Sequence, residues 1–94
     1  MMSQIPIKIE GMNKKQMDTE ILRAGMIAEL DAINMYEQMA ALANDSNIKK
    51  KLLDIAKEEK THLGEFQALL LNRDKEQVEE LEKSKKEVKE EVGE

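Results

Sequence analysis

The sequence predicts an all-α protein in which an antiparallel two-helix hairpin is followed by a C-terminal helix. Apolar residues recur at steps of three and four through residues 22–40 and 48–69, which is the spacing of one helix face. The two segments are joined by Asn-Asp-Ser-Asn at positions 44–47, a cluster of turn-forming residues. Because this loop is short, the two helices are expected to lie antiparallel.

Residues 1–13 are expected to form an extended N-terminal arm. Isoleucines at positions 5, 7 and 9 alternate with other residues, which is a strand-like period rather than a helical one. Pro6, the only proline, and Gly11 also disfavour a helix here. The arm therefore precedes the helical part of the chain.

The helical hairpin is expected to span residues 14–72. Asn13 and Gln16 have the spacing of a capping box, which places the start of the first helix next to them. The second helix is expected to run from about Ile48 to Leu71.

Residues 73–94 are expected to form a charged C-terminal helix or tail. Asp74 and Gln77 again have capping-box spacing, and Lys and Glu dominate the sequence that follows. The apolar stripe in this segment is thin, so its charge density favours an exposed and weakly docked segment.

Composition excludes several classes of function. The 94 residues carry a net charge of −5 and two aromatic side chains, so the chain offers no basic face or stacking surface for nucleic acid. It has no cysteine, which excludes disulfides, thiol chemistry and Fe–S clusters. No apolar run approaches the ~18 residues of a membrane span. The chain is therefore expected to be a soluble, cytoplasmic protein that stabilises a thin core by oligomerising.

Three polar residues interrupt the apolar seams of the hairpin. Glu59 and His62 occupy consecutive turns of the second seam, and Glu29 lies in the middle of the first. Burying an unpartnered carboxylate is costly, and a shared Fe, Mn or Zn ion would offset that cost. Di-iron carboxylate bundles take one Glu from each of two helices and a Glu-x-x-His pair from each of two others. One chain supplies half of such a site, so a two-fold dimer would complete it.

Other interpretations of these residues remain open at this point. Glutamate makes up fifteen of the 94 residues, so a lone histidine has about one chance in six of a Glu three positions before it. His62 can instead be a core histidine bonded to a carbonyl, and Glu29 can pair with Lys57 or Lys60 across the hairpin. Tyr36, on the same face as Glu29, can be an ordinary core residue. The polar groups would then only set the register of a metal-free helical assembly.

Two stretches resemble the encapsulated ferritins, the short ferritin-like proteins housed inside encapsulin nanocompartments. They are Ile-Ala-Glu-Leu-Asp-Ala-Ile-Asn-Met-Tyr-Glu-Gln at 27–38 and Lys-Glu-Glu-Lys-Thr-His, followed by Gly-Glu-Phe, at 57–66. The resemblance covers residues 21–74. It implies that two protomers form a ferritin-like four-helix bundle with a di-iron ferroxidase centre at their interface. It also implies that dimers assemble into a ring, commonly a decamer, inside an encapsulin shell.

The resemblance also implies roles for particular residues. Glu29, Glu59 and His62 would be the iron ligands, with two ions per dimer and Glu59 as the bridge. Tyr36 would lie beside the site, and Asp31 would guide iron inward. The implied activity is that of a ferroxidase, which oxidises Fe(II) to Fe(III) with oxygen and feeds iron storage in the nanocompartment.

The chain departs from the family pattern in three respects. Ala28 and Met35 stand where some members have Glu and Trp, so the path of iron to the site is less acidic. The residues up to Glu94 show no encapsulin-targeting peptide, which fits members in which this domain precedes the shell protein in one polypeptide.

Peroxide reduction of the rubrerythrin kind is the alternative di-iron activity, although the Cys-rich electron-transfer module usual in those proteins is absent from this sequence.

Overall fold

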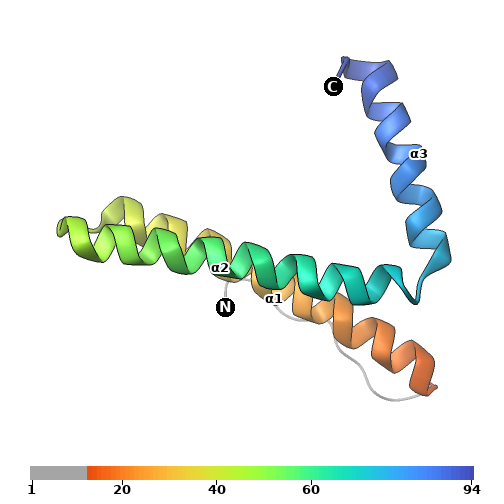
Figure 1. Ribbon diagram of the computed structural model, residues 1–94, viewed down its shortest axis with the longest axis horizontal. Coiled ribbons are helices and arrows are strands. Elements are labelled where there is room, and N and C mark those ends of the chain that lie inside the picture. Colours follow the sequence, from red (N-terminus) through yellow and green to blue (C-terminus); the bar gives the residue numbers. More distant parts are fainter. Residues whose placement is uncertain (1–12) are drawn as a thin grey trace.

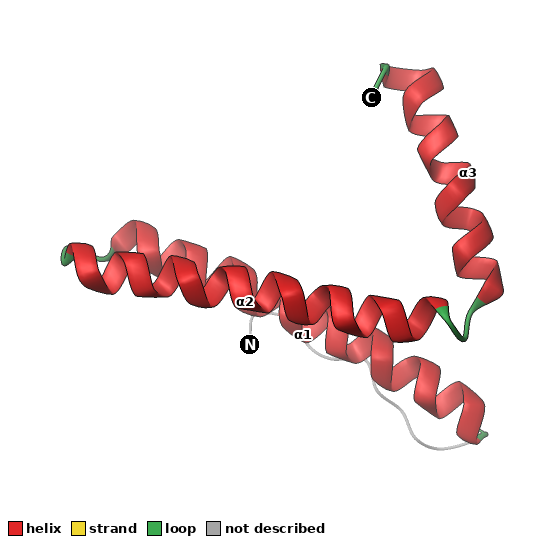
Figure 2. Cartoon of the chain, viewed as in Figure 1, coloured by secondary structure: helices red, strands yellow, loops and turns green. Residues whose placement is uncertain are grey.

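The computed structural model describes residues 13–94, and this part of the chain contains three helices and no strands (Figures 1 and 2). Helix α1 spans Lys14–Leu42, α2 spans Ser46–Leu71 and α3 spans Lys75–Val92. The predicted all-α class, with a hairpin followed by a C-terminal helix, is confirmed. The expected N-terminal arm lies, except for Asn13, outside the described residues.

Side chains at the helix starts determine where the hairpin begins and turns. The N–H of Gln16 donates to Oδ1 of Asn13 at 2.8 Å, and the N–H of Asn13 donates to Oε1 of Gln16 at 3.2 Å. This is the capping box predicted from the sequence. Helix α2 begins at Ser46, two residues before the expected start, because Oδ1 of Asp45 accepts the N–H groups of Asn47 and Ile48.

Helices α1 and α2 pack side by side and cross at a shallow angle, as Figure 1 shows. The buried apolar residues between them are mostly small: Ala24, Ile33, Ala40, Ala56 and Leu70. Alanines at three of these positions let the two backbones approach closely. The same small side chains make a thin core, as the composition predicted.

Much apolar surface remains exposed on the single chain. Within residues 13–94, eleven large apolar side chains are exposed: Ile21, Leu30, Met35, Met39, Leu42, Ile48, Leu53, Leu69, Val78, Val88 and Val92. The chain is flat, with extents of 47 × 41 × 19 Å, so one hairpin offers little interior in which to bury them. Within residues 13–94, no helix combines the length and the apolar character that a membrane crossing requires. Extensive exposed apolar surface is typical of a chain that associates with a partner.

Helix α3 projects away from the hairpin and none of its residues is buried (Figure 1). Its start is held by Asp74, whose Oδ1 accepts the N–H of Gln77 at 3.0 Å. The other carboxylate oxygen of Asp74 accepts a hydrogen bond from Nη2 of Arg23 on α1, also at 3.0 Å. One side chain therefore both caps α3 and ties its first turn to α1.

Gly64, in the interior of α2, gives a test of the helical assignment. A Cβ placed there meets no atom within 4 Å, so alanine would remove backbone entropy without a clash. We expect Gly64→Ala to raise the free energy of unfolding by about 0.5–1 kcal/mol. Urea unfolding of metal-free protein, followed by circular dichroism at one fixed protein concentration, measures this. A destabilised variant would contradict the finding that a Cβ at position 64 meets no other atom.

Candidate metal site

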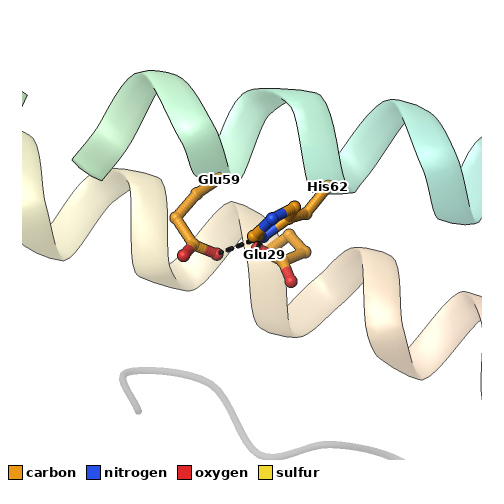
Figure 3. Close-up of side chains that lie close together, drawn as sticks. All are labelled: Glu29, Glu59 and His62. Atoms are coloured by element: carbon orange, nitrogen blue, oxygen red, sulfur yellow. Dashed lines mark ion pairs between the residues drawn. The ribbon is translucent and has the colours of Figure 1, made fainter. Parts of the chain in front are cut away.

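Three side chains from the two hairpin helices meet near the middle of the hairpin. Figure 3 shows Glu29 of α1 and the pair Glu59 and His62 of α2 pointing toward one another. One ligand atom from each lies within 4.8 Å of the others. Nδ1 of His62 is 3.6 Å from Oε2 of Glu59 and 3.8 Å from Oε2 of Glu29. The structure thus brings together the three residues that the sequence had placed on facing seams.

The carboxylates of this cluster are withdrawn from water while the imidazole remains accessible. Side-chain exposure is 16% for Glu29, 20% for Glu59 and 48% for His62. The Oε2 atom of Glu29 is fully buried and has no hydrogen-bond partner among the described residues. Its 3.8 Å distance from the imidazole nitrogen is too long for a hydrogen bond. A buried carboxylate oxygen in this position is costly unless a cation or donor meets it.

Two of the ordinary explanations for these residues do not hold in the structure. Lys60 reaches Glu37, with Nζ 3.1 Å from Oε2, and forms its ion pair there rather than with Glu29. His62 is half exposed and therefore is not a core histidine. Within residues 13–94 its ring makes no hydrogen bond to a backbone carbonyl. Among residues 13–94, the two carboxylates therefore face only the imidazole of His62, which carries a positive charge only when it is protonated.

The donor set fits a divalent transition-metal ion. Two carboxylates supply hard, anionic oxygens, and the imidazole supplies a nitrogen donor that suits Fe, Zn and similar ions. The i, i+3 spacing holds Glu59 and His62 on one face of α2, so both can reach the same ion. Glu29 approaches from the opposing helix. Three protein donors leave further coordination positions open, which suits a reactive site better than a closed structural one.

A recess of about 330 Å³ lies beside the cluster and opens to solvent. Its lining includes Glu29 and His62 together with Glu65, Phe66 and Leu69. Neither Glu65 nor Phe66 was predicted from the sequence to belong to the site. Their spacing in the sequence could have identified them, because they follow His62 by three and four residues and so share its helix face.

The two remaining candidates from the sequence lie on α1 with the first ligand. Tyr36 is partly exposed and follows Glu29 by seven residues, two helical turns. Asp31 is buried, with 7% of its surface exposed. A carboxylate that guides iron from solvent has to meet solvent, and in the single chain Asp31 does so only slightly. The roles of both residues stay predictions.

A helical hairpin that aims carboxylate and imidazole groups at one point corresponds to half of a four-helix carboxylate metal-site bundle. Comparison with known proteins gives the family. The sequence profile of the rubrerythrin family matches residues 20–93. The chain therefore belongs to the rubrerythrin family, whose members are iron-binding oxidoreductases.

Two relatives give a closer relationship within that family. A ferritin-like–encapsulin shell fusion protein of Pyrococcus furiosus is 64% identical over 74 residues, which cover 79% of this chain. The match covers 21% of that relative, so the chain spans about a fifth of its length. The crystal structure of the encapsulated ferritin domain from Pyrococcus furiosus superimposes with a TM-score of 0.84 at 54% identity. That match covers 98% of this chain and 96% of the other. The resemblance to encapsulated ferritins is confirmed.

Replacing Glu29 tests whether the cluster binds metal. We expect Glu29→Gln to weaken the binding of Fe(II), measured anaerobically, by at least about 100-fold. Loss of a residue that only orients a metal ligand lowers metal affinity by about 10–100-fold, and loss of a ligand should cost more. Glu37→Gln is the matched control, since Glu37 lies on the same helix but pairs with Lys60. Equal affinities for the wild type and both variants would contradict the site.

Proposed function

We propose that this chain is a ferroxidase that oxidises Fe(II) to Fe(III) with oxygen at a di-iron site shared between two copies. The observation that supports it most directly is the convergence of Glu29, Glu59 and His62 around a buried carboxylate oxygen that has no hydrogen-bond partner among residues 13–94. Membership of an iron-binding family favours iron over manganese or zinc. The 64% identical relative, named as a ferritin-like protein fused to an encapsulin shell, supports a role in iron storage.

The half-complete donor set supports a site shared by two copies. Di-iron carboxylate bundles draw four carboxylates and two imidazoles from four helices, and one hairpin here supplies half of them. The half-exposed His62 and the open recess leave one side of the cluster accessible. A second copy related by a two-fold axis would present the same groups to that side, because such an interface uses one surface twice. The proposed dimer is a four-helix bundle with two ions.

The charges of such a shared site favour the oxidised product. Glu29 and Glu59 from two copies supply four negative charges, and Coulomb attraction to them grows with the charge of the cation. They therefore stabilise Fe(III) more than Fe(II). Each Fe(II) substrate gives up one electron, so a pair reduces one oxygen molecule to hydrogen peroxide with the uptake of two protons. Neutral His62 adds a donor without adding charge.

The proposed setting is an encapsulin nanocompartment. A flat chain with a thin core offers no internal space for mineral, so the Fe(III) product needs an enclosing shell. In the Pyrococcus furiosus relative, the ferritin-like part and the shell belong to one fusion protein. We propose that dimers of this chain form a ring, of which a decamer is the expected form, and that the ring associates with an encapsulin shell.

Iron oxidation tests the proposed activity. We expect the wild type to oxidise Fe(II) in air much faster than buffer, and His62→Ala to fall to the protein-free rate, because the variant loses the imidazole that accompanies Glu59 on α2. The appearance of Fe(III) is followed optically, and helix content by circular dichroism. The control is Glu37→Gln, which leaves the cluster intact.

Two results would contradict the ferroxidase proposal. Wild-type rates equal to the protein-free rate would leave a metal-free assembly module as the better interpretation. Faster oxidation of Fe(II) with hydrogen peroxide than with oxygen would indicate peroxide reduction instead. This comparison is relevant because the chain belongs to the rubrerythrin family.

Association in the presence of iron tests whether the site is shared. A ligand that binds only the dimer stabilises it by mass action, by about 2.7 kcal/mol per site at 100 times its dissociation constant. We expect anaerobic Fe(II) at that level to lower the dimer dissociation constant by about 100-fold for each shared site. Sedimentation velocity with and without Fe(II) measures this, with Glu29→Gln as the variant that should not respond. Association independent of iron would contradict a shared site.

A further inference from the structure

The phenyl ring of Phe66 on α2 lies directly against the backbone of α1 at Gly25. A Cβ built on Gly25 would lie 2.7, 2.8 and 2.9 Å from three carbons of this ring. Carbon atoms in contact prefer a separation of about 3.5–4.0 Å. No residue with a side chain fits at position 25 unless the ring or one of the helices moves by about 1 Å.

This contact lies one helical turn from the metal ligands on both helices. Gly25 precedes Glu29 by four residues, and Phe66 follows His62 by four. Because α1 and α2 run antiparallel, the level of the glycine–ring contact is adjacent to the level at which Glu29 meets His62. Phe66 also lines the recess beside the cluster, together with Glu29 and His62.

The two distances in the cluster depend on different parts of the structure. Glu59 and His62 share α2, so their separation of 3.6 Å follows from helix geometry. The 3.8 Å between Glu29 and His62 spans two helices and depends on how closely these approach. On the other side of the cluster, the buried side chains of Ile33 and Ala56 and the exposed ion pair between Glu37 and Lys60 link the two helices. The contact at Gly25 differs from these because it leaves no room for a side chain, so a Cβ at this position would press the ring and α1 apart.

We propose that Gly25 and Phe66 are a pair of positioning residues that set the spacing of α1 and α2 at the metal site. The missing side chain at position 25 lets the ring pack against α1, and this brings Glu29 within reach of the ion held by Glu59 and His62. Neither residue contacts the metal. The inference rests on the proposed function insofar as it requires the cluster to bind a metal ion.

A double-mutant cycle on metal affinity tests this pair. The variants are Gly25→Ala, Phe66→Leu and the two combined, and Gly64→Ala is the matched control because alanine fits there without contact. Co(II) is the probe, since its visible absorption reports both affinity and coordination geometry. Thermal unfolding and circular dichroism of metal-free protein show whether each variant folds.

We expect Gly25→Ala to weaken Co(II) binding by about 10–100-fold and to change the Co(II) spectrum, with helix content retained. Phe66→Leu should also weaken binding, because the spacer between the helices is lost. The combined variant should recover to within about 3-fold of the wild type, because the alanine methyl occupies space that the ring has left. Gly64→Ala should bind as the wild type does.

Two outcomes would overturn the positioning role. One is wild-type affinity and spectrum in a folded Gly25→Ala variant, and the other is a combined variant no better than Phe66→Leu. The second comparison decides the matter even if Gly25→Ala alone does not fold. A wild type that binds neither Co(II) nor Fe(II) would overturn the metal site and this inference with it. A wild type that binds Co(II) and shows the coupling, yet does not oxidise Fe(II), would overturn only the ferroxidase activity.

Discussion

One buried carboxylate oxygen, Oε2 of Glu29, is the constraint on which the arrangement of the hairpin depends. It lies between two helices, out of water and without a hydrogen-bond partner in residues 13–94. Leaving an ionised oxygen in that position costs several kcal/mol, whereas a cation between Glu29 and the pair on α2 would turn the cost into a binding interaction. The surrounding turns pack through small residues and one ring against a glycine, and this brings the helices close enough that such an ion could be shared.

The same close approach limits the stability of the single chain. Alanines at 24, 40 and 56 permit tight packing but bury little apolar area, and large side chains remain on the outside. Hydrophobic stabilisation is roughly proportional to the apolar area removed from water, so this hairpin is poorly stabilised alone. Association would bury the exposed apolar residues and complete the donor set in one step. Folding, assembly and metal binding are therefore expected to be linked.

The two halves of the donor set are held in physically different ways. Glu59 and His62 are neighbours on one helix, and any helix with that sequence places them together. Glu29 joins them only through the packing of α1 on α2. Its position is therefore sensitive to residues that carry no metal-binding group at all. Another contact between distant segments lies at the end of the hairpin. There Asp74 caps the first turn of α3 and forms an ion pair with Arg23 of α1.

The local features of this chain could be predicted from the sequence because each depends on residues that are close together in the chain. Helical period, the capping box at Asn13 and the shared face of Glu59 and His62 are set within a few residues. The start of α2 was misplaced by two residues because either Asp45 or its neighbours can cap a helix. Only the tertiary structure showed that Oε2 of Glu29 has no hydrogen-bond partner in the described part of the chain, that Lys60 pairs with Glu37, and that the ring of Phe66 lies against Gly25. These facts concern distances between helices, which arise from packing over the whole hairpin and leave no periodic signal in the sequence.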